Sequence, residues 1–191
     1  EAGTAITTGD NNVYVGASAG DLATTSGNNT GIGHNALGGN ILGSNNVAVG
    51  KDALEEMNPA SAVDMYNTAV GASAGQKVTI GIGNSLIGGL AGDALTDAHY
   101  NVAVGSYALT ADTLGSRSTA IGVSALESQN FASATNTYNT AVGFAAGSAV
   151  TTGVQNTLIG GLAGDAITTA NANTALGYSA LGATTTGALN T

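Results

Sequence analysis

The sequence predicts an all-β fold, a parallel β-solenoid of about ten turns, from three observations. First, a pattern of asparagine, two variable residues, an aliphatic residue, glycine, two variable residues and alanine recurs along the whole chain. Second, the recurrences follow a 17-residue period, as from Asn12 to Asn29, which two 21-residue intervals interrupt. Third, each recurrence opens with a short alternating segment such as Asn139–Gly143. Alternation with a period of two is typical of a strand, and no window shows the spacing of an amphipathic helix.

The repeats divide the chain into turns. Each residue is numbered within its turn, and the asparagine or serine that opens the turn is the first position. The turns begin at Asn12, Asn29, Asn46, Asn67, Asn84, Asn101, Ser118, Asn139, Asn156 and Asn173. The ninth position reads glycine, leucine, leucine, glycine in a cycle of four turns, and both long turns occupy the same place in that cycle. The larger unit is therefore a 72-residue super-repeat, as from Asn12 to Asn84. Residues 1–191 are predicted to be one solenoid array and a segment of a longer fibre.

The aliphatic fourth position is interpreted as the structural core. Its residues are Val15, Ile32, Val49, Val70, Ile87, Val104, Ile121, Val142, Ile159 and Leu176. Stacked turns would place these side chains in one column about 4.8 Å apart, with Val70, Ile87 and Val104 as vertical neighbours. Glycine at the fifth position permits a sharp corner with positive φ, and alanine at the eighth suits walls that nearly touch. The third position points to the other side of the strand. A thin coil cannot bury both columns, so one of them is expected to pack against another chain.

Composition excludes several classes of partner. The net charge is −9, and the only basic residues besides two histidines are Lys51, Lys77 and Arg117, which are scattered. Nucleic-acid binding requires clustered cations, so no nucleic acid is expected. The chain has no cysteine, and therefore neither disulfides nor a thiolate metal site. No apolar run approaches the length of a membrane span, so we expect no membrane insertion by this segment, and we expect no cofactor.

Motifs that resemble catalytic sequences have simpler explanations in the repeat. Gly16–Gly20 and Gly71–Gly75 match the G-x-S-x-G nucleophile elbow, but both fall at the same repeat position and no helix is expected after them. Gly31–Ala36 imitates a dinucleotide fingerprint, again without a following helix. The two histidines, His34 and His99, occupy different repeat positions and are expected to be solvated. The chain is therefore predicted not to be an enzyme and to have no catalytic residues.

Aspartate recurs at the tenth position of three turns. Asp21, Asp93 and Asp165 are each separated by one super-repeat. Carboxylates gathered between chains could bind Ca²⁺, a cation that prefers oxygen ligands. The alternative, which we favour, is that each is a corner residue that accepts backbone hydrogen bonds.

The two long turns are the best candidates for specific contacts. Residues 55–66 and 127–138 carry the four-residue insertions, and insertions in solenoids often form a binding face. These segments also hold large side chains, which are otherwise scarce. The candidate contact residues are Met57, Pro59, Met65, Tyr66, Phe131 and Tyr138. Two interpretations stay open, receptor contact and packing between neighbouring chains, and packing is slightly favoured.

The segment Asn173–Leu181, followed by Thr185-Thr186-Gly187, resembles a known class of repeats. It is similar to the head repeats of YadA-like trimeric autotransporter adhesins, and closer still to the 17-residue repeats of bacteriophage tail fibres. The resemblance implies a left-handed β-roll, with three chains intertwined or packed around one axis as a homotrimer. It also implies an extracellular location, on a cell surface or on a virion. The turns here are longer than those of the adhesin heads.

These observations together predict a structural fibre, shaft or adhesin segment that mediates attachment. The expected partners are copies of the chain itself, as a homotrimer or filament, and a host-surface glycan or protein receptor. One alternative is a subunit of a self-assembling extracellular filament. Another is an ice-binding solenoid, which requires a regular threonine column. Thr30, Thr68, Thr119, Thr140, Thr157 and Thr174 form such a column at the second position, but Val13, Val47, Ser85 and Val102 interrupt it.

Overall fold

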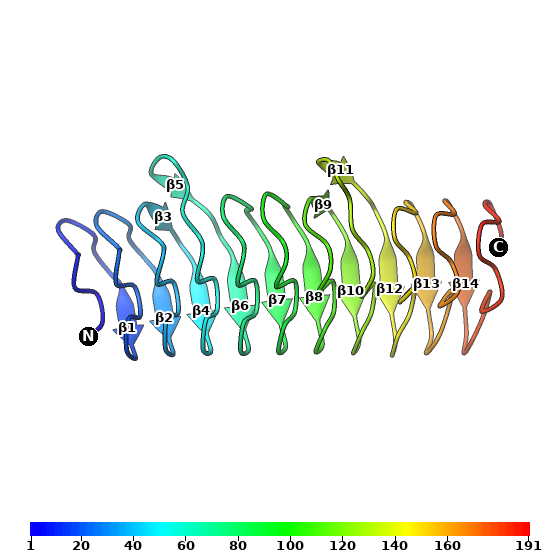
Figure 1. The fold of residues 1–191 in the computed structure, drawn as a ribbon, viewed down its shortest axis with the longest axis horizontal. Helices are drawn as coiled ribbons and strands as arrows, with labels where there is room; N and C mark the ends of the chain where they lie inside the picture. Colours follow the sequence, from blue (N-terminus) through cyan, green and yellow to red (C-terminus); the bar gives the residue numbers. More distant parts are fainter.

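The computed structural model describes all residues from Glu1 to Thr191 and contains strands and turns but no helix. Ten three-residue strands form one parallel sheet that runs along the whole length of the rod (Figure 1). They are β1 (Val13–Val15), β2 (Thr30–Ile32), β4 (Val47–Val49), β6 (Thr68–Val70), β7 (Ser85–Ile87), β8 (Val102–Val104), β10 (Thr119–Ile121), β12 (Thr140–Val142), β13 (Thr157–Ile159) and β14 (Thr174–Leu176). The predicted all-β parallel solenoid is confirmed.

The turns stack in the register that the repeat predicts. Ile87 in β7 pairs with Val70 in β6 on one side and with Val104 in β8 on the other. The long turns do not disturb this register, since Val49 pairs with Val70 across the first of them. The four extra residues are therefore accommodated away from the sheet.

Two projecting loops hold the extra residues of the long turns. In the first, β5 (Val63–Asp64) pairs with β3 (Gly43–Ser44) of the preceding turn. In the second, β11 (Thr135–Asn136) pairs with β9 (Gly115–Ser116) in the same way. Figure 1 shows both loops rising from the same edge of the rod. Insertions separated by one super-repeat therefore share one side of the molecule.

The interior is filled from the third position of each turn, so the sequence-based core assignment is wrong. Ala69, Leu86 and Ala103 are completely buried, whereas the fourth-position residues Val70 and Ile87 are 37% and 42% exposed. The reason is the narrow space that a 17-residue turn encloses. Alanines at the eighth position, most of them also fully buried, form the opposite wall and leave no room for a column of valine and isoleucine. The larger aliphatic side chains therefore point outwards.

Large and small residues alternate across the interior so that each turn encloses a similar volume. Leu86 at the third position faces Gly92 at the ninth, where an added Cβ would lie 2.9 Å from a leucine methyl. Ala103, in the next turn, is matched instead by the buried Leu109. Where both positions are small, as at Gly75, the leucines of adjacent turns fill the space. The glycine–leucine cycle read from the sequence is thus a packing cycle.

The fifth-position glycine is required at the corner after each strand. Gly122 has a φ of 136°, a conformation that side-chain-bearing residues rarely adopt. A Cβ at this residue would also collide with the carbonyl oxygen of Gly143 in the next turn. Gly177, in the last complete turn, has a similar φ of 120° but nothing within 4 Å of its missing Cβ. Stacking therefore adds a steric requirement to the backbone requirement.

Asparagine at the first position forms a buried ladder along the rod. The backbone N–H of Asn84 donates to Oδ1 of Asn67 at 2.9 Å, and Nδ2 of Asn84 donates to the carbonyl of Ala98 at 2.8 Å. Asn101 repeats the first of these bonds with Asn84 at 3.0 Å. Each amide satisfies backbone groups that have no partner in the sheet. The ladder changes only where Ser118 replaces asparagine.

Candidate interaction face

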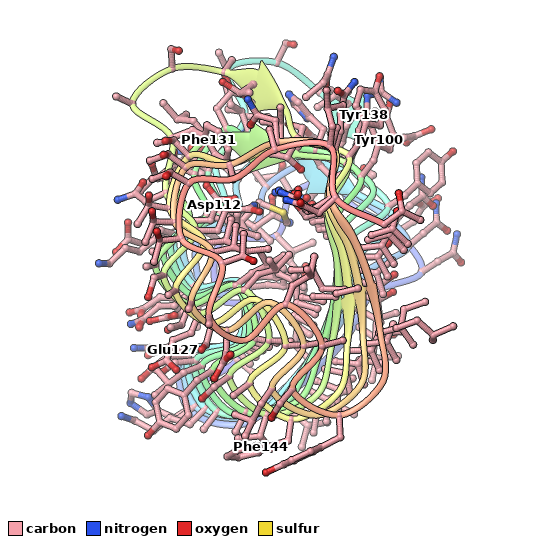
Figure 2. The ribbon with its side chains drawn as sticks, turned by 90° about the vertical axis from the view of Figure 1, so that its right-hand side faces the viewer. Tyr100, Asp112, Glu127, Phe131, Tyr138 and Phe144 are labelled. Carbon is pink, nitrogen blue, oxygen red and sulfur yellow. The ribbon has the colours of Figure 1, made fainter.

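The side chains at the second and fourth positions of the ten turns, which are the two ends of each strand, form a flat surface, called the outer face below. It is built from valine, isoleucine, leucine, threonine and one serine, and carries no charge. Ile121 and Ile159 remain 38% exposed even between neighbouring turns. In the end-on view of Figure 2 the strands occupy one side of the oval section, and Glu127 lies on the opposite side.

The outer face is large for an exposed apolar surface. Ten three-residue strands, about 4.8 Å apart and about 10 Å long, give roughly 480 Å². Apolar patches of this size on soluble proteins are typical of interaction sites. Phe144 extends the apolar surface at the lower corner, where it is 63% exposed.

Four of the six candidate contact residues in the long turns do not reach the surface. Met57 and Met65 are completely buried and converge beneath Gly43, and Pro59 and Phe131 are also buried. These side chains fill the chain's own interior rather than a gap between chains. Tyr66 and Tyr138, in contrast, are 63% and 54% exposed. Only the two tyrosines are placed to touch a partner.

These tyrosines belong to a row of residues at the upper corner of the outer face. Each residue of this row immediately precedes the first position of a turn. The middle of this row, called the corner ridge below, consists of Tyr66, Gly83, Tyr100, Arg117 and Tyr138. The guanidinium of Arg117 lies over the Tyr100 ring, 5.2 Å from its centroid. Its Nε donates to Oδ1 of Asn136 in the second projecting loop at 3.0 Å.

The three tenth-position aspartates have different neighbours. The hydroxyl of Thr4 donates to Asp21, and the hydroxyl of Thr110 donates to Asp93. One carboxylate oxygen of Asp165 is buried without a hydrogen-bond partner. Being four turns apart, the three do not come together within the chain. No group of three or more histidine, cysteine or acidic side chains is arranged to hold a metal ion.

The motif matches lie at ordinary corners of the solenoid. Ser18 and Ser73 both have left-handed backbone, with φ of 56° and 54°, and no helix follows either of them. Nδ1 of His34 is 3.6 Å from Asp52, and Nε2 of His99 is 3.1 Å from Asp97. Neither imidazole hydrogen-bonds to these serines. The strand-turn-helix setting of a nucleophile elbow is therefore missing.

A buried polar network inside the second long turn was not predicted from the sequence. Nε2 of Gln129 donates to Oδ2 of Asp112 at 2.5 Å and to Oγ of Ser118 at 2.8 Å. Oε1 of Gln129 accepts from Asn139 at 2.8 Å, and the Ser118 and Thr137 hydroxyls are 2.6 Å apart. All five side chains are almost completely buried. They connect three successive turns through the interior.

Asp112 is the unusual member of this network, since it carries an acid group in the core. Burial raises the pKa of its carboxyl, although hydrogen bonds from Gln129 and from the backbone of Gly115 oppose the shift. The sequence feature that could have indicated this buried acid is its position in the turn. Asp112 and Gln129 occupy the twelfth position, which in several other turns holds an aliphatic residue such as Val78 or Leu95, although Asn40 and Thr184 are polar there too.

The architecture defines a repeat protein of the β-solenoid class. No family model, no curated protein and no solved structure matches this chain. The structure also has no helix that is long and apolar enough to cross a membrane. The outer face, the corner ridge and the buried network therefore have to be interpreted from their own chemistry.

Proposed function

We propose that this chain is a structural fibre or shaft segment that mediates attachment at a cell surface or on a virion. Its working form is a homotrimer in which the outer faces of three copies pack around a common axis. The observation that carries this proposal is the outer face, an uncharged surface along the whole rod in which an aliphatic column runs beside a column rich in threonine. Burial of such a surface between copies is strongly favourable, at about 25 cal/mol per Å² before the costs of association.

The rest of the chain suits a mechanical role. Each turn is joined to the next by backbone hydrogen bonds and by the asparagine ladder, which gives a stiff and regular rod. A repeated surface on such a rod can make many weak contacts, and their combined avidity exceeds any single affinity. The resemblance to tail-fibre and adhesin repeats supports the same role, because those proteins act in attachment.

The mass of the protein in solution tests the proposal. Light scattering should give a mass near three times the 18.3 kDa of one chain. A monomer at micromolar concentration would contradict the homotrimer and remove the main support for a fibre.

A pair of charge substitutions locates the interface. Lysine at Ile87 and Ile121 would place two charges in the middle of the outer face. We expect the I87K/I121K variant to become monomeric while keeping its β-sheet circular dichroism. Ser128→Lys is the matched control, because Ser128 is exposed and lies next to Glu127 on the opposite side of the section. Trimers in both variants would show that the outer face is not the interface.

A second candidate, ice binding, is favoured by one observation. The outer face is a flat sheet in which threonine occupies six of the ten second positions beside an aliphatic column. Four second positions lack threonine, so the ordered hydroxyl lattice is incomplete. We expect no thermal hysteresis in a millimolar solution. A clear hysteresis gap that is abolished by Thr119→Lys would favour this candidate over the fibre.

A further inference from the structure

The corner ridge carries the most distinctive surface chemistry of the molecule. Three of the chain's six tyrosines, Tyr66, Tyr100 and Tyr138, lie in this one row. They are 63%, 50% and 54% exposed. Figure 2 shows Tyr100 and Tyr138 at the same corner of the section, one behind the other along the axis. The ridge is therefore a straight aromatic line parallel to the rod.

The tyrosines are spaced by two turns. Gly83 separates the first from the second, and Arg117 separates the second from the third. The turns repeat about every 4.8 Å, so the spacing of the tyrosines is about 9.6 Å. A linear ligand that follows the ridge should have a repeat close to this length.

The tyrosines occupy backbone positions that do not favour them. Tyr66, Tyr100 and Tyr138 have φ of 53°, 58° and 52°, in the left-handed region. Among residues with a side chain, asparagine tolerates this region best. Asparagine does occupy the same place in the row at Asn45. The left-handed backbone is common to the whole row, Ala172 and Leu189 included, so the corner sets this φ and the tyrosines do not. Local backbone stability therefore does not explain why tyrosine stands at three of these positions.

Polar groups stand beside the aromatic rings. The Tyr66 hydroxyl donates to Asp64 of the first projecting loop at 3.1 Å. Arg117 is held over Tyr100 and donates to Asn136 of the second loop. The two loops rise at either end of the segment between Tyr66 and Tyr138 (Figure 1). The ridge thus combines aromatic surface with carboxylate, amide and guanidinium groups.

We propose that the corner ridge binds an extended, β-1,4-linked polysaccharide that runs along the rod. The proposal rests on the attachment role proposed above and names its ligand class. Each pyranose ring has an apolar face of C–H groups and an edge of hydroxyls, which match an aromatic ring with polar neighbours. An extended β-1,4-linked chain repeats every disaccharide, at a length close to the tyrosine spacing. A strand of peptide repeats every two residues, about 6.7 Å, and does not match it.

Affinity gel electrophoresis with defined polymers tests this proposal. Hydroxyethylcellulose and glucomannan serve as extended β-1,4-linked probes, and pullulan serves as an α-linked control whose chain is not extended. We expect the first two polymers to retard the protein and pullulan to leave its mobility unchanged. Equal mobility in gels with and without both β-1,4-linked polymers would overturn the proposal.

Replacing the ridge tyrosines by asparagine makes the test specific. In Y66N/Y100N/Y138N each tyrosine is replaced by the residue that Asn45 places in the same row. We expect at least a tenfold loss of affinity for hydroxyethylcellulose with no decrease in thermal stability. The matched control is Y107N/Y178N, because both tyrosines are exposed but lie off the ridge. Unchanged binding by the triple variant, or equal loss in the control, would overturn the proposal.

Light scattering on the same samples separates this proposal from the fibre function. A protein with trimeric mass whose mobility the polymers do not change would contradict the polysaccharide site alone. A monomer that is retarded through its tyrosines contradicts the trimer alone. If the triple variant loses its trimeric mass, the ridge is part of the interface between copies, and the polysaccharide site is overturned.

Discussion

The two long turns share one backbone but have different interiors. Asn40, Asn46, Met57 and Met65 in the first region correspond, one super-repeat later, to Asp112, Ser118, Gln129 and Thr137 in the second. Both sets are buried. The first interior is apolar at Met57 and Met65, and its polar members are Asn46 of the ladder and Asn40, which hydrogen-bonds to the backbone of Gly43. The second is a continuous hydrogen-bonded network.

The difference begins with a break in the asparagine ladder. In the first region, Oδ1 of Asn46 accepts from the backbone N–H of Asn67 at 3.0 Å. Ser118 is too short to make the equivalent bond, and the N–H of Asn139 faces Oγ1 of Thr137 at 3.4 Å instead. Thr137 therefore takes over part of the role that asparagine has elsewhere.

The remaining exchanges follow from the same break. Nδ2 of Asn67 meets the sulfur of Met57 at 3.7 Å, whereas Nδ2 of Asn139 meets Oε1 of Gln129 at 2.8 Å. Gln129 also donates hydrogen bonds from its Nε2 to Asp112 and to Ser118. Methionine and glutamine have similar lengths, so the volume is conserved while the polarity changes. The four positions therefore form one unit and should be substituted together.

The largest effect is expected from replacing the centre of the polar network alone. Gln129→Met removes the hydrogen bonds that satisfy Asp112 and Asn139 in the interior. Leaving buried polar groups unpaired should lower the free energy of unfolding by roughly 3 kcal/mol at pH 7. Hydrogen exchange of the turns that begin at Asn101 and Ser118 measures it locally. A loss below about 1 kcal/mol would show that the network contributes little.

The reverse exchange in the first region should cost less. Met57→Gln places an amide beside Met65, Asn40 and Asn67, without the carboxylate and the hydroxyl that accept from its counterpart Gln129. A partly paired amide in an apolar site should cost about 2 kcal/mol, measured by hydrogen exchange of the turns that begin at Asn29 and Asn46. A cost equal to that of Gln129→Met would mean that the two interiors do not differ in polarity.

The two regions should also differ in their response to pH. Burial raises the pKa of Asp112 in the folded chain above its value in the unfolded chain. The stability that its protonated form contributes is complete below the pKa in the unfolded chain, near 3.9. It is lost as the pH rises through the pKa in the folded chain. The second region should therefore be stabilised relative to the first, which has Asn40 at this position, when the pH is lowered from 7 to 4.

Asp112→Asn provides the control for this pH dependence, because an amide does not titrate. The stability difference between wild type and variant should shift in favour of the variant as the pH rises. Asp52 contributes to both proteins equally. Burial acts to raise its pKa, but Lys51 and His34 lower it overall. A difference that is independent of pH would contradict a titrating Asp112.

The smallest effect is expected from exchanging the whole unit. The variant D112N/S118N/Q129M/T137M gives the second region the interior of the first. We expect its free energy of unfolding to lie within about 1 kcal/mol of wild type, although Gln129→Met alone is costly. A loss equal to the sum of the single variants would show that the four residues act independently.

The repeat phase, the register and the glycine corners could be predicted because they are local features that recur in every turn. Fifth-position residues such as Gly122 are recognisable from spacing alone. The orientation of the strands could not be predicted in the same way, because both columns of each strand are apolar. Val70 points outwards because the eighth-position alanine opposite narrows the interior, and this depends on how the turn closes.

The sequence pattern also could not predict which side chains fill the interior of the long turns. The insertions could be recognised, and so could the wealth of large side chains in them. Whether Met57 and Phe131 point inwards depends on the path of the projecting loop. The network around Gln129 requires contacts between the first, twelfth and next-to-last positions, drawn from three successive turns. Comparing the two super-repeats residue by residue would have shown the polar exchange but not its geometry.

Introduced thiols test most directly whether the fourth-position column is the contact surface between copies. The chain has no cysteine, so single substitutions report without background. Under mild oxidation, or with a short thiol cross-linker, Ile121→Cys should give covalently joined chains, and Ser128→Cys should not. Ala120→Cys, one residue away and buried, should react only after unfolding in urea. A reactive Ala120→Cys in the folded protein, with no more cross-linking at Ile121→Cys than at Ser128→Cys, would contradict the outward column and the interface built on it.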